Sequence, residues 1–328
     1  MPAIYAESLV KHYSPEIRAV DGIDLSIEAG QIFGFLGQNG SGKTTTVRML
    51  TTLLRPTSGR ATVDGLDVVH RASAVRRRIG VALQDASLDD MQTGRELLML
   101  QARLYGVDGN GMSTRVSELL AVVDLADAAD RLVKTYSGGM KRRLDLAAAL
   151  VHRPGILFLD EPTTGLDPIS REAIWRYVTE LNRDLGTTLF LTTQYLEEAD
   201  RLADEVAIIE EGKIVAQGSP DELKATIGTD VVTVRIAGGG DEVSRGAAVV
   251  RRLEGAEDVR VVDDSVVVYI REGSSAIARI VLLLNEESLR LEEVTLARPT
   301  LDDVFLQKTG HHLTAGERAA AAAGGSAA

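Results

Sequence analysis

The segment Gly-Gln-Asn-Gly-Ser-Gly-Lys-Thr at residues 37–44 decides the fold, because it fits the phosphate-loop pattern G-x-x-x-x-G-K-[ST]. It directly follows the apolar run Ile32–Leu36, which predicts a buried strand. Glycines let successive main-chain N–H groups turn towards a phosphate, and the next helix directs its positive end there. We expect Lys43 to neutralise phosphate oxygens and Thr44 to ligate Mg²⁺; the alternative is an ordinary glycine-rich turn.

A second motif lies at the end of another apolar run, where Ile156–Asp160 is followed directly by Glu161. A phosphate loop requires a second carboxylate for the metal, and Asp160 is placed to supply it. Glu161 is one residue further along an extended chain, so it faces the other side and can accept a proton from an attacking water. Two solvated acids at a strand end are the alternative interpretation.

Short apolar runs alternate with longer amphipathic stretches over residues 4–228, which predicts an α/β domain with parallel strands joined by helices. Further strands of this kind are expected at Ile79–Leu83, Thr188–Thr192 and Val206–Glu210. Near the start, the pattern favours antiparallel strands at Ile4–Val10, Ile23–Ile27 and Ala61–Val63, with turns at Asp21-Gly22 and Asp64-Gly65.

The pattern changes near residue 229, so we expect a second domain over residues 229–310. Its runs follow the order strand, helix, strand, strand, helix, strand, which is typical of a small α+β, ferredoxin-like domain. A last short helix is expected at Leu301–Lys308. Residues 311–328 are rich in alanine and glycine and are expected to form a flexible tail.

The composition of the 328 residues excludes several classes of protein. Acidic residues outnumber basic ones by 48 to 36, and no long basic block is present, so direct nucleic-acid binding is not expected. With no cysteine, disulfides, thiol nucleophiles and cysteine-based metal sites are excluded. The N-terminal residues do not resemble a signal peptide, and the apolar runs fall short of the roughly 20 residues that cross a bilayer.

A third motif, Tyr-Ser-Gly-Gly-Met at residues 136–140, precedes a predicted helix and places Ser137 at its N-terminus, another position suited to an anion. With the two motifs above, in this order and spacing, residues 4–228 resemble the ATP-binding cassette (ABC) ATPases, whose signature is Leu-Ser-Gly-Gly-Gln. The resemblance implies a phosphate-loop ATPase domain with an antiparallel β subdomain and a helical subdomain. It also implies that two copies enclose two ATP molecules between them.

The resemblance implies roles for individual residues. Glu161, Lys43 and Gln194 match catalytic positions, and Thr44, Gln84 and Asp160 match positions that contact Mg²⁺. Gln84 also matches the glutamine that lies where a membrane partner docks. The positions that match contacts to ATP are Tyr13 on the adenine, Gly37, Gln38, Asn39, Gly40, Ser41, Gly42, Lys43, Thr44, Thr45, Gln84, Asp160, the opposite copy's Ser137, Gly139 and Met140, and Asp167 at the dimer interface.

Two departures from the ABC pattern stand out. The signature begins with Tyr136 and ends with Met140, which leaves Ser137 and the glycines intact. Gln194 occupies the position where most of the family has histidine. An amide donates a hydrogen bond to a phosphate but neither carries charge nor shuttles a proton.

Gln194 within Leu-Thr-Thr-Gln-Tyr-Leu-Glu-Glu-Ala-Asp, the segment 136–144 and the segment 298–305 together resemble the daunorubicin/doxorubicin-resistance exporter ATPases over nearly the whole chain. This implies ATP hydrolysis that powers efflux of a hydrophobic drug or antibiotic-like molecule through a separate multi-spanning permease. It also implies peripheral association with the cytoplasmic face of the cell membrane. The alternatives are a soluble ABC ATPase of translation or DNA maintenance and a nucleotide-dependent regulator without turnover.

Overall fold

The computed structural model describes residues 2–83, 88–107, 109–227, 230–270, 273–297, 299–311 and 313. The chain divides into two compact units, Met1–Ser219 and Pro220–Ala328. The division falls before helix α8 (Pro220–Ile227) instead of after it, where the change in sequence pattern placed it. The physical reason is that α8 packs against the last helix of the chain, α11 (Leu301–Thr309).

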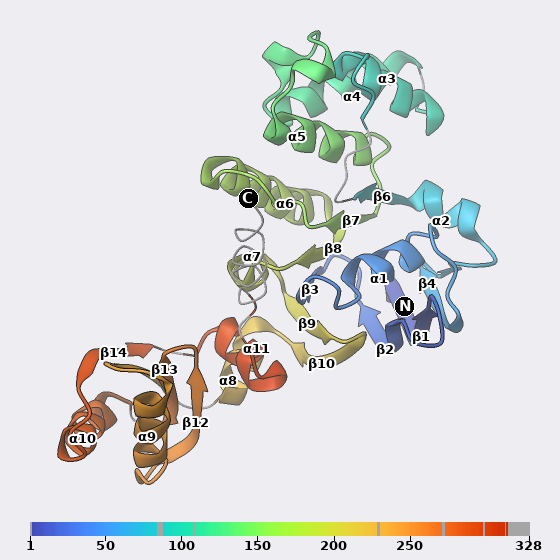
Figure 1. Cartoon of the computed structure of the whole chain (residues 1–328). Coiled ribbons are helices and arrows are strands. Elements are labelled where there is room, and N and C mark those ends of the chain that lie inside the picture. The colour runs from blue at the N-terminus through green and yellow to red at the C-terminus, as the bar shows by residue number, and fades with distance from the viewer. Residues whose placement is uncertain are drawn as a thin grey trace, which may run out of the picture. The chain divides into compact units, whose positions relative to one another are not determined.

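The first unit is built on a six-stranded sheet in the order β10-β9-β3-β8-β7-β6 (Figure 1). All its neighbouring pairs are parallel except β10 with β9. Every residue of β3, β7 and β8 is buried, as expected for strands covered on both faces. The strands are β3 (Ile32–Leu36), β6 (Ile79–Ala82), β7 (Ile156–Asp160), β8 (Thr188–Thr193), β9 (Glu205–Glu210) and β10 (Lys213–Gly218).

A second sheet in this unit is antiparallel, in the order β2-β1-β4-β5, which confirms the predicted antiparallel subdomain. The turn predicted at Asp64-Gly65 joins the last two strands. The turn predicted at Asp21-Gly22 is wrong. Val10 pairs with Asp21 and Leu9 with Ile23, so Gly22 (φ +82°) is the extra residue of a bulge. The strands are β1 (Ile4–His12), β2 (Arg18–Ile27), β4 (Ser58–Val63) and β5 (Leu66–Asp67).

Helices surround the six-stranded sheet, and three of them form a helical subdomain between β6 and β7 in the sequence (Figure 1). The subdomain contains α3 (Gly94–Leu104), α4 (Gly109–Val122) and α5 (Gly138–Ala149). A capping box between Thr93 and Glu96 fixes the start of α3. The remaining helices are α1 (Lys43–Leu50), α2 (Ala72–Arg78), α6 (Pro168–Leu185) and α7 (Leu196–Leu202).

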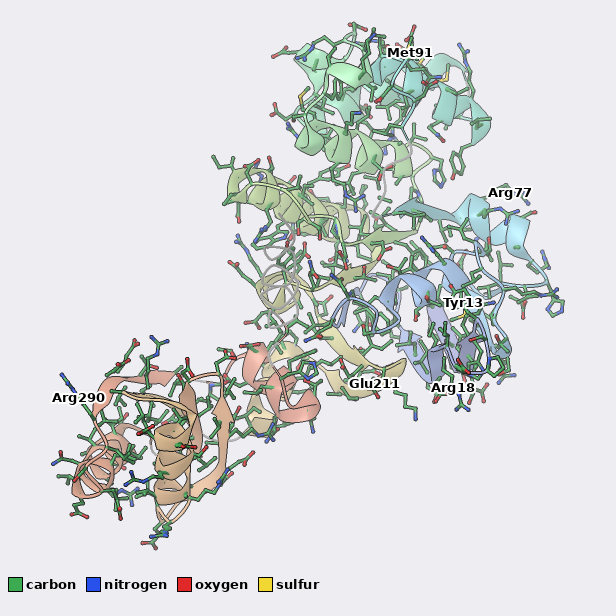
Figure 2. All side chains as sticks on the ribbon, viewed as in Figure 1. Tyr13, Arg18, Arg77, Met91, Glu211 and Arg290 are labelled. Carbon is green, nitrogen blue, oxygen red and sulfur yellow. The ribbon has the colours of Figure 1, made fainter. Side chains whose placement is uncertain are left out.

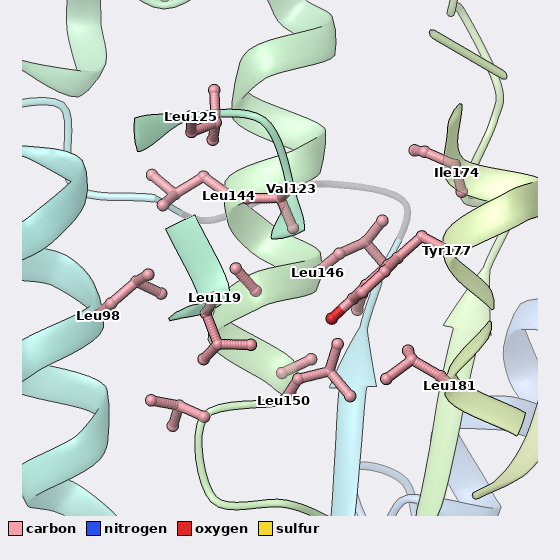
Figure 3. Packing of buried hydrophobic residues seen from close by; sticks show 14 of the residues in the cluster. Leu98, Leu119, Val123, Leu125, Leu144, Leu146, Leu150, Ile174, Tyr177 and Leu181 are labelled. Atoms are coloured by element: carbon pink, nitrogen blue, oxygen red, sulfur yellow. The ribbon is translucent and has the colours of Figure 1, made fainter. Parts of the chain in front are cut away.

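Alternate residues of the strands enter two separate hydrophobic cores. Phe158 and Phe190 enter the core shared with the antiparallel sheet, with their ring centroids 5.5 Å apart. Leu157 and Leu159 enter the core shared with the helical subdomain, where Leu146 of α5 and Tyr177 of α6 are also buried (Figure 3). Each such buried side chain contributes about 1.5–3 kcal/mol by leaving water, so both ends of β7 are held firmly.

The second unit contains a four-stranded antiparallel sheet in the order β12-β13-β11-β14. Its elements follow the order β-α-β-β-α-β, which confirms the predicted ferredoxin-like fold. Val232, Val234, Val266 and Val268 lie in the core with residues of α9 and α10. The elements are β11 (Asp230–Ile236), α9 (Gly240–Val250), β12 (Ala256–Val262), β13 (Ser265–Ile270), α10 (Gly273–Glu286) and β14 (Leu291–Ala297).

Helix α11 closes the second unit and carries the segment Leu301–Leu306, in which four of the six residues are buried. Phe305 is fully buried, and Arg260 of β12 donates to the carbonyl oxygen of Leu306 at 2.7 Å. The apolar side chains of this helix are therefore part of the unit's own interior. Within the described residues, no helix of either unit is both long and apolar enough to cross a membrane.

Candidate active site

The loop between β3 and α1 passes so close to neighbouring chain that two of its positions require glycine. A Cβ at Gly42 would lie 2.4 Å from the carbonyl oxygen of Ala19, and Gly42 has φ +114°. A Cβ at Gly37 would lie 2.5 Å from the carbonyl oxygen of Ile209. Any larger residue would push the loop away from β9 and β2, so the curved main chain at 37–42 depends on both glycines.

This loop lines a hollow of about 300 Å³. The surface of the hollow combines main-chain groups of the loop with one cation, one carboxylate and two hydroxyl-bearing side chains. Ser41 is buried beside it, and its Oγ atom has no hydrogen-bond partner among the described residues. The hollow is lined by Ala19, Asn39, Gly40, Gly42, Lys43, Thr44, Thr45 and Glu161.

Lys43, the first residue of α1, is almost fully buried in this hollow. Its Nζ atom donates to the carbonyl oxygens of Gly37 at 2.7 Å and Gln38 at 3.0 Å. Nζ also lies 3.4 Å from Oε1 of Glu161. Burial lowers the pKa of Lys43, and the nearby carboxylates of Glu161 and Asp160 oppose that shift without cancelling it. An anion entering the hollow would favour the charged form of this lysine.

Asp160, the last residue of β7, is fully buried and meets the start of α1. Its Oδ1 atom accepts hydrogen bonds from Thr192 Oγ1 at 2.6 Å and from Thr44 Oγ1 at 3.3 Å. Its Oδ2 atom is buried without a hydrogen-bond partner among the described residues. A buried, unsatisfied carboxylate oxygen beside a threonine hydroxyl is an oxygen donor set that suits Mg²⁺.

Glu161 has φ +50°, a conformation that is strained for a residue with a side chain. Neighbouring groups hold it there: its N–H donates to Thr192 Oγ1 at 3.0 Å and to the Thr192 carbonyl at 3.1 Å. Its carboxylate accepts from Thr164 Oγ1 at 3.2 Å through Oε2 and faces Lys43 through Oε1. The strained main chain thus directs a buried carboxylate into the hollow.

Gln194 lies directly after β8, between that strand and α7, and is half-buried. The segment that follows it is anchored by Glu198, whose Oε1 atom accepts from Thr163 Oγ1 at 3.0 Å and from Trp175 Nε1 at 2.9 Å. Burial raises the pKa of Glu198. The residue at position 194 is therefore held at the same edge of the sheet as Asp160 and Glu161, the edge formed by the carboxyl ends of β7 and β8.

Other predicted site residues are placed away from the hollow. Ser137 caps α5 and accepts from the N–H of Met140 at 3.3 Å, and Gly139 lies near Ser170. Asp167 caps α6, and hydrogen bonds from Ser170 lower the pKa of its carboxyl. Tyr13 follows β1 at the surface and is 54% exposed (Figure 2). Ser137, Gly139, Met140, Asp167 and Tyr13 are therefore not among the described residues that line the hollow of their own copy. Gln84 lies outside the described residues.

The comparisons with known proteins agree across almost the whole chain. A family model for ABC transporters matches residues 20–164, and a model for the C-terminal domain of DrrA1-3-like ATP-binding proteins matches residues 218–309. The chain is 46% identical to the daunorubicin resistance ATP-binding protein DrrA2 of Streptomyces coeruleorubidus, over 94% of this chain and 95% of that one. It belongs to the ABC exporter ATPases of the daunorubicin/doxorubicin-resistance type. It is therefore an ATP-hydrolysing subunit of an ABC exporter.

Further relatives of this exporter ATPase extend the agreement. The chain is 39% identical to the doxorubicin resistance ATP-binding protein DrrA of Mycobacterium tuberculosis, over 94% of this chain and 93% of that one. Among solved structures it resembles cbiO1 from Clostridium perfringens, part of an ABC transporter complex, with TM-score 0.63 and 29% identity over 68% of this chain and 91% of that one. A bacterial ABC transporter cassette solved as a dimer matches with TM-score 0.62 and 25% identity, over 66% and 98%.

Sequence reasoning missed two groups that organise the site of this exporter ATPase. Thr192 joins the side chain of Asp160 to the main chain of Glu161. Arg142 of α5 is buried and donates to the carbonyl oxygen of Asp160 at 2.8 Å. A signal for Arg142 exists in the sequence, because it lies four and seven residues before the buried positions Leu146 and Ala149, on the inner face of the helix.

Proposed function

We propose that the loop 37–44 binds the phosphates of ATP, with its main-chain N–H groups and Lys43 facing them. The main support is that Lys43, Thr44, Asp160 and Glu161 meet at one edge of the sheet, around a hollow of about 300 Å³. Lys43 is held by two carbonyl oxygens and one carboxylate, so it exchanges these partners for phosphate oxygens without leaving its position. Tyr13, at the surface, is assigned to the adenine ring.

We propose Thr44 and Asp160 as the protein ligands that hold Mg²⁺, together with Gln84. The unsatisfied Oδ2 atom of Asp160 and the nearby hydroxyl of Thr44 fit a hard cation that prefers oxygen. Held by these residues, Mg²⁺ would supply positive charge against the phosphate oxygens. Thr192 keeps the Asp160 carboxylate directed at the site by donating to its other oxygen.

Glu161 is proposed as the general base that accepts a proton from the attacking water. Its carboxylate is buried, borders the hollow and is oriented by Thr164 and Lys43. A general base must lie within reach of the water that it deprotonates, and a carboxylate that borders the hollow is placed for that role. Gln194 is assigned a hydrogen bond from its side-chain amide to the γ-phosphate.

We propose that two copies enclose two ATP molecules. Ser137, Gly139 and Met140 form the N-terminus of α5, where N–H groups favour an anion, yet they do not line the hollow of their own copy. We assign this end of the helix to the γ-phosphate of the ATP that a second copy holds. Asp167 is assigned to the same interface. The dimeric cassette among the similar structures supports this arrangement.

The transported substance is proposed to be a hydrophobic drug or antibiotic-like molecule, because relatives at 46–47% identity are named for daunorubicin and doxorubicin resistance. The permease is proposed to be a separate multi-spanning protein, with this chain bound peripherally at the cytoplasmic face of the membrane. ATP-driven closure of the dimer and reopening after hydrolysis would move the permease between its two states.

Co-purification tests this proposal directly. The chain is tagged in its own cells, membranes are solubilised gently, and the proteins that are recovered are identified with and without ATP. We expect a stoichiometric multi-spanning membrane protein. Recovery in the soluble fraction alone, or with ribosomes or DNA, would contradict the exporter assignment.

Replacing Gln194 by histidine is expected to keep or raise the rate of ATP hydrolysis, within about a factor of ten. Histidine retains a hydrogen-bond donor and adds the capacity to carry charge. Phosphate release at saturating ATP measures the effect, and Gln194→Ala, which lacks a donor, is expected to fall below the wild type. A loss of activity in Gln194→His would show that this site is adapted to an amide.

A further inference from the structure

Two arginines follow each other in the second turn of α5, and they lie in different surroundings. Arg143 donates to the carbonyl oxygens of Val123 and Asp124 and to the Asp124 carboxylate, so it joins α5 to the end of α4. Arg142 is only 7% exposed and extends from α5 to the main chain that follows β6 and β7. Arg143 therefore makes its contacts within the helical subdomain, whereas Arg142 connects the subdomain to the six-stranded sheet.

The guanidinium of Arg142 donates to three carbonyl oxygens. Its Nη1 atom donates to Leu83, directly after β6. Its Nη2 atom donates to Asp160 at 2.8 Å and its Nε atom donates to Pro162 at 3.1 Å. The last two carbonyls lie on either side of Glu161. One planar side chain therefore fixes the main chain both before and after the proposed general base.

This arrangement bears on the strain at Glu161. A positive φ costs about 1–3 kcal/mol and persists only where surrounding groups enforce it. Thr192 holds the N–H of Glu161, while Arg142 holds the flanking carbonyls. Asp145, one turn further along α5, lies 3.2 Å from Nη1 of Arg142. Burial raises the pKa of Asp145 to about 6, against the opposing effect of Arg142.

We propose that Arg142 is a positioning residue for ATP hydrolysis. Its guanidinium links the N-terminal part of α5 to the orientation of Glu161. The helix begins at Ser137, the residue assigned to the opposite copy's nucleotide, so a shift of α5 on dimer closure reaches Glu161 through this guanidinium. The inference rests on the proposed function, in which Glu161 is the general base. Arg142 itself touches no reacting atom.

The test compares Arg142→Gln, Arg142→Lys and the control Arg143→Gln. We expect Arg142→Gln to lower kcat at least 10-fold while the dissociation constant for ATP, measured without Mg²⁺, stays within about 2-fold. Lysine keeps the charge but not the planar fork, so its kcat should lie between those of Arg142→Gln and the wild type. Arg143→Gln should stay within about 2-fold of the wild type. If Arg142→Gln does not fold, Arg142→Lys decides: a kcat equal to that of the wild type would overturn the proposal.

A double variant separates this inference from the proposed function. If Arg142 acts through Glu161, adding Arg142→Gln to Glu161→Gln should leave the residual rate unchanged. A further 10-fold loss in the double variant, or an equal loss in Arg143→Gln, would reject the positioning role and leave the general base in place. Unchanged turnover in Glu161→Gln alone would instead reject the general base, whatever Arg142 does.

Discussion

Glu161→Gln is expected to lower the rate of ATP hydrolysis by about 10²–10⁴-fold, the usual contribution of a general base. Glutamine has the same shape, so the variant keeps the contact with Thr164 and the main-chain hydrogen bonds to Thr192. It does not accept a proton from water. ATP binding should be retained, and two copies should stay closed around the nucleotide because the step that reopens them is blocked.

Two measurements check this expectation. Phosphate release at saturating ATP gives the rate, and size-exclusion chromatography with light scattering, with and without ATP, gives the oligomeric state. Glu172→Gln is the matched control, because Glu172 is half-exposed and pairs with Arg201 at the surface. Equal turnover by the wild type and Glu161→Gln would remove Glu161 from the catalytic assignment.

Lys43→Ala is expected to weaken ATP binding by at least ~10²-fold. Hydrogen bonds to charged groups contribute about 1.5–3 kcal/mol each, and Nζ now makes two with loop carbonyls that it would exchange for phosphate oxygens. The variant also leaves Glu161 buried without its cation at 3.4 Å, which adds repulsion towards an incoming phosphate. Both effects act in the same direction.

Equilibrium binding of a fluorescent ATP analogue measures this loss directly. Lys213→Ala is the control, since Lys213 is 63% exposed and its nearest carboxylate is Asp21 at 3.5 Å. We expect its affinity to match that of the wild type. An affinity of Lys43→Ala within 10-fold of the wild type would show that the loop binds phosphate mainly through its main-chain N–H groups.

The sequence allowed the sheet and the glycine-rich loop between β3 and α1 to be predicted because their signals are local. Uninterrupted apolar runs such as Ile32–Leu36 predict strands buried on both faces, and the spacing of glycines in 37–42 predicts the loop. The prediction of a turn at Asp21-Gly22 was wrong because the local signal is ambiguous. An Asp-Gly pair suits a tight turn and a bulge alike, and only pairing with β1 distinguishes them.

The supporting groups of the site were harder to predict because their contacts are distant in sequence. Thr192 meets Asp160 across 32 positions, and Arg142 meets Leu83 across 59. Thr192 carries no motif of its own, and the helical spacing that places Arg142 on the inner face of α5 does not indicate which groups it contacts. The strain at Glu161 is likewise invisible in the sequence, since glutamate is not among the residue types that favour positive φ.

The packing of α8 against α11 determines the best junction for a chimera between this protein and a relative. A chimera with the junction between residues 219 and 220 transfers both helices together, so Phe305 keeps its own surroundings. A junction after residue 228 separates them and sets the foreign α11 against an unmatched α8. Exchanging C-terminal units at the earlier junction would therefore keep the contact between α8 and α11 native in each hybrid.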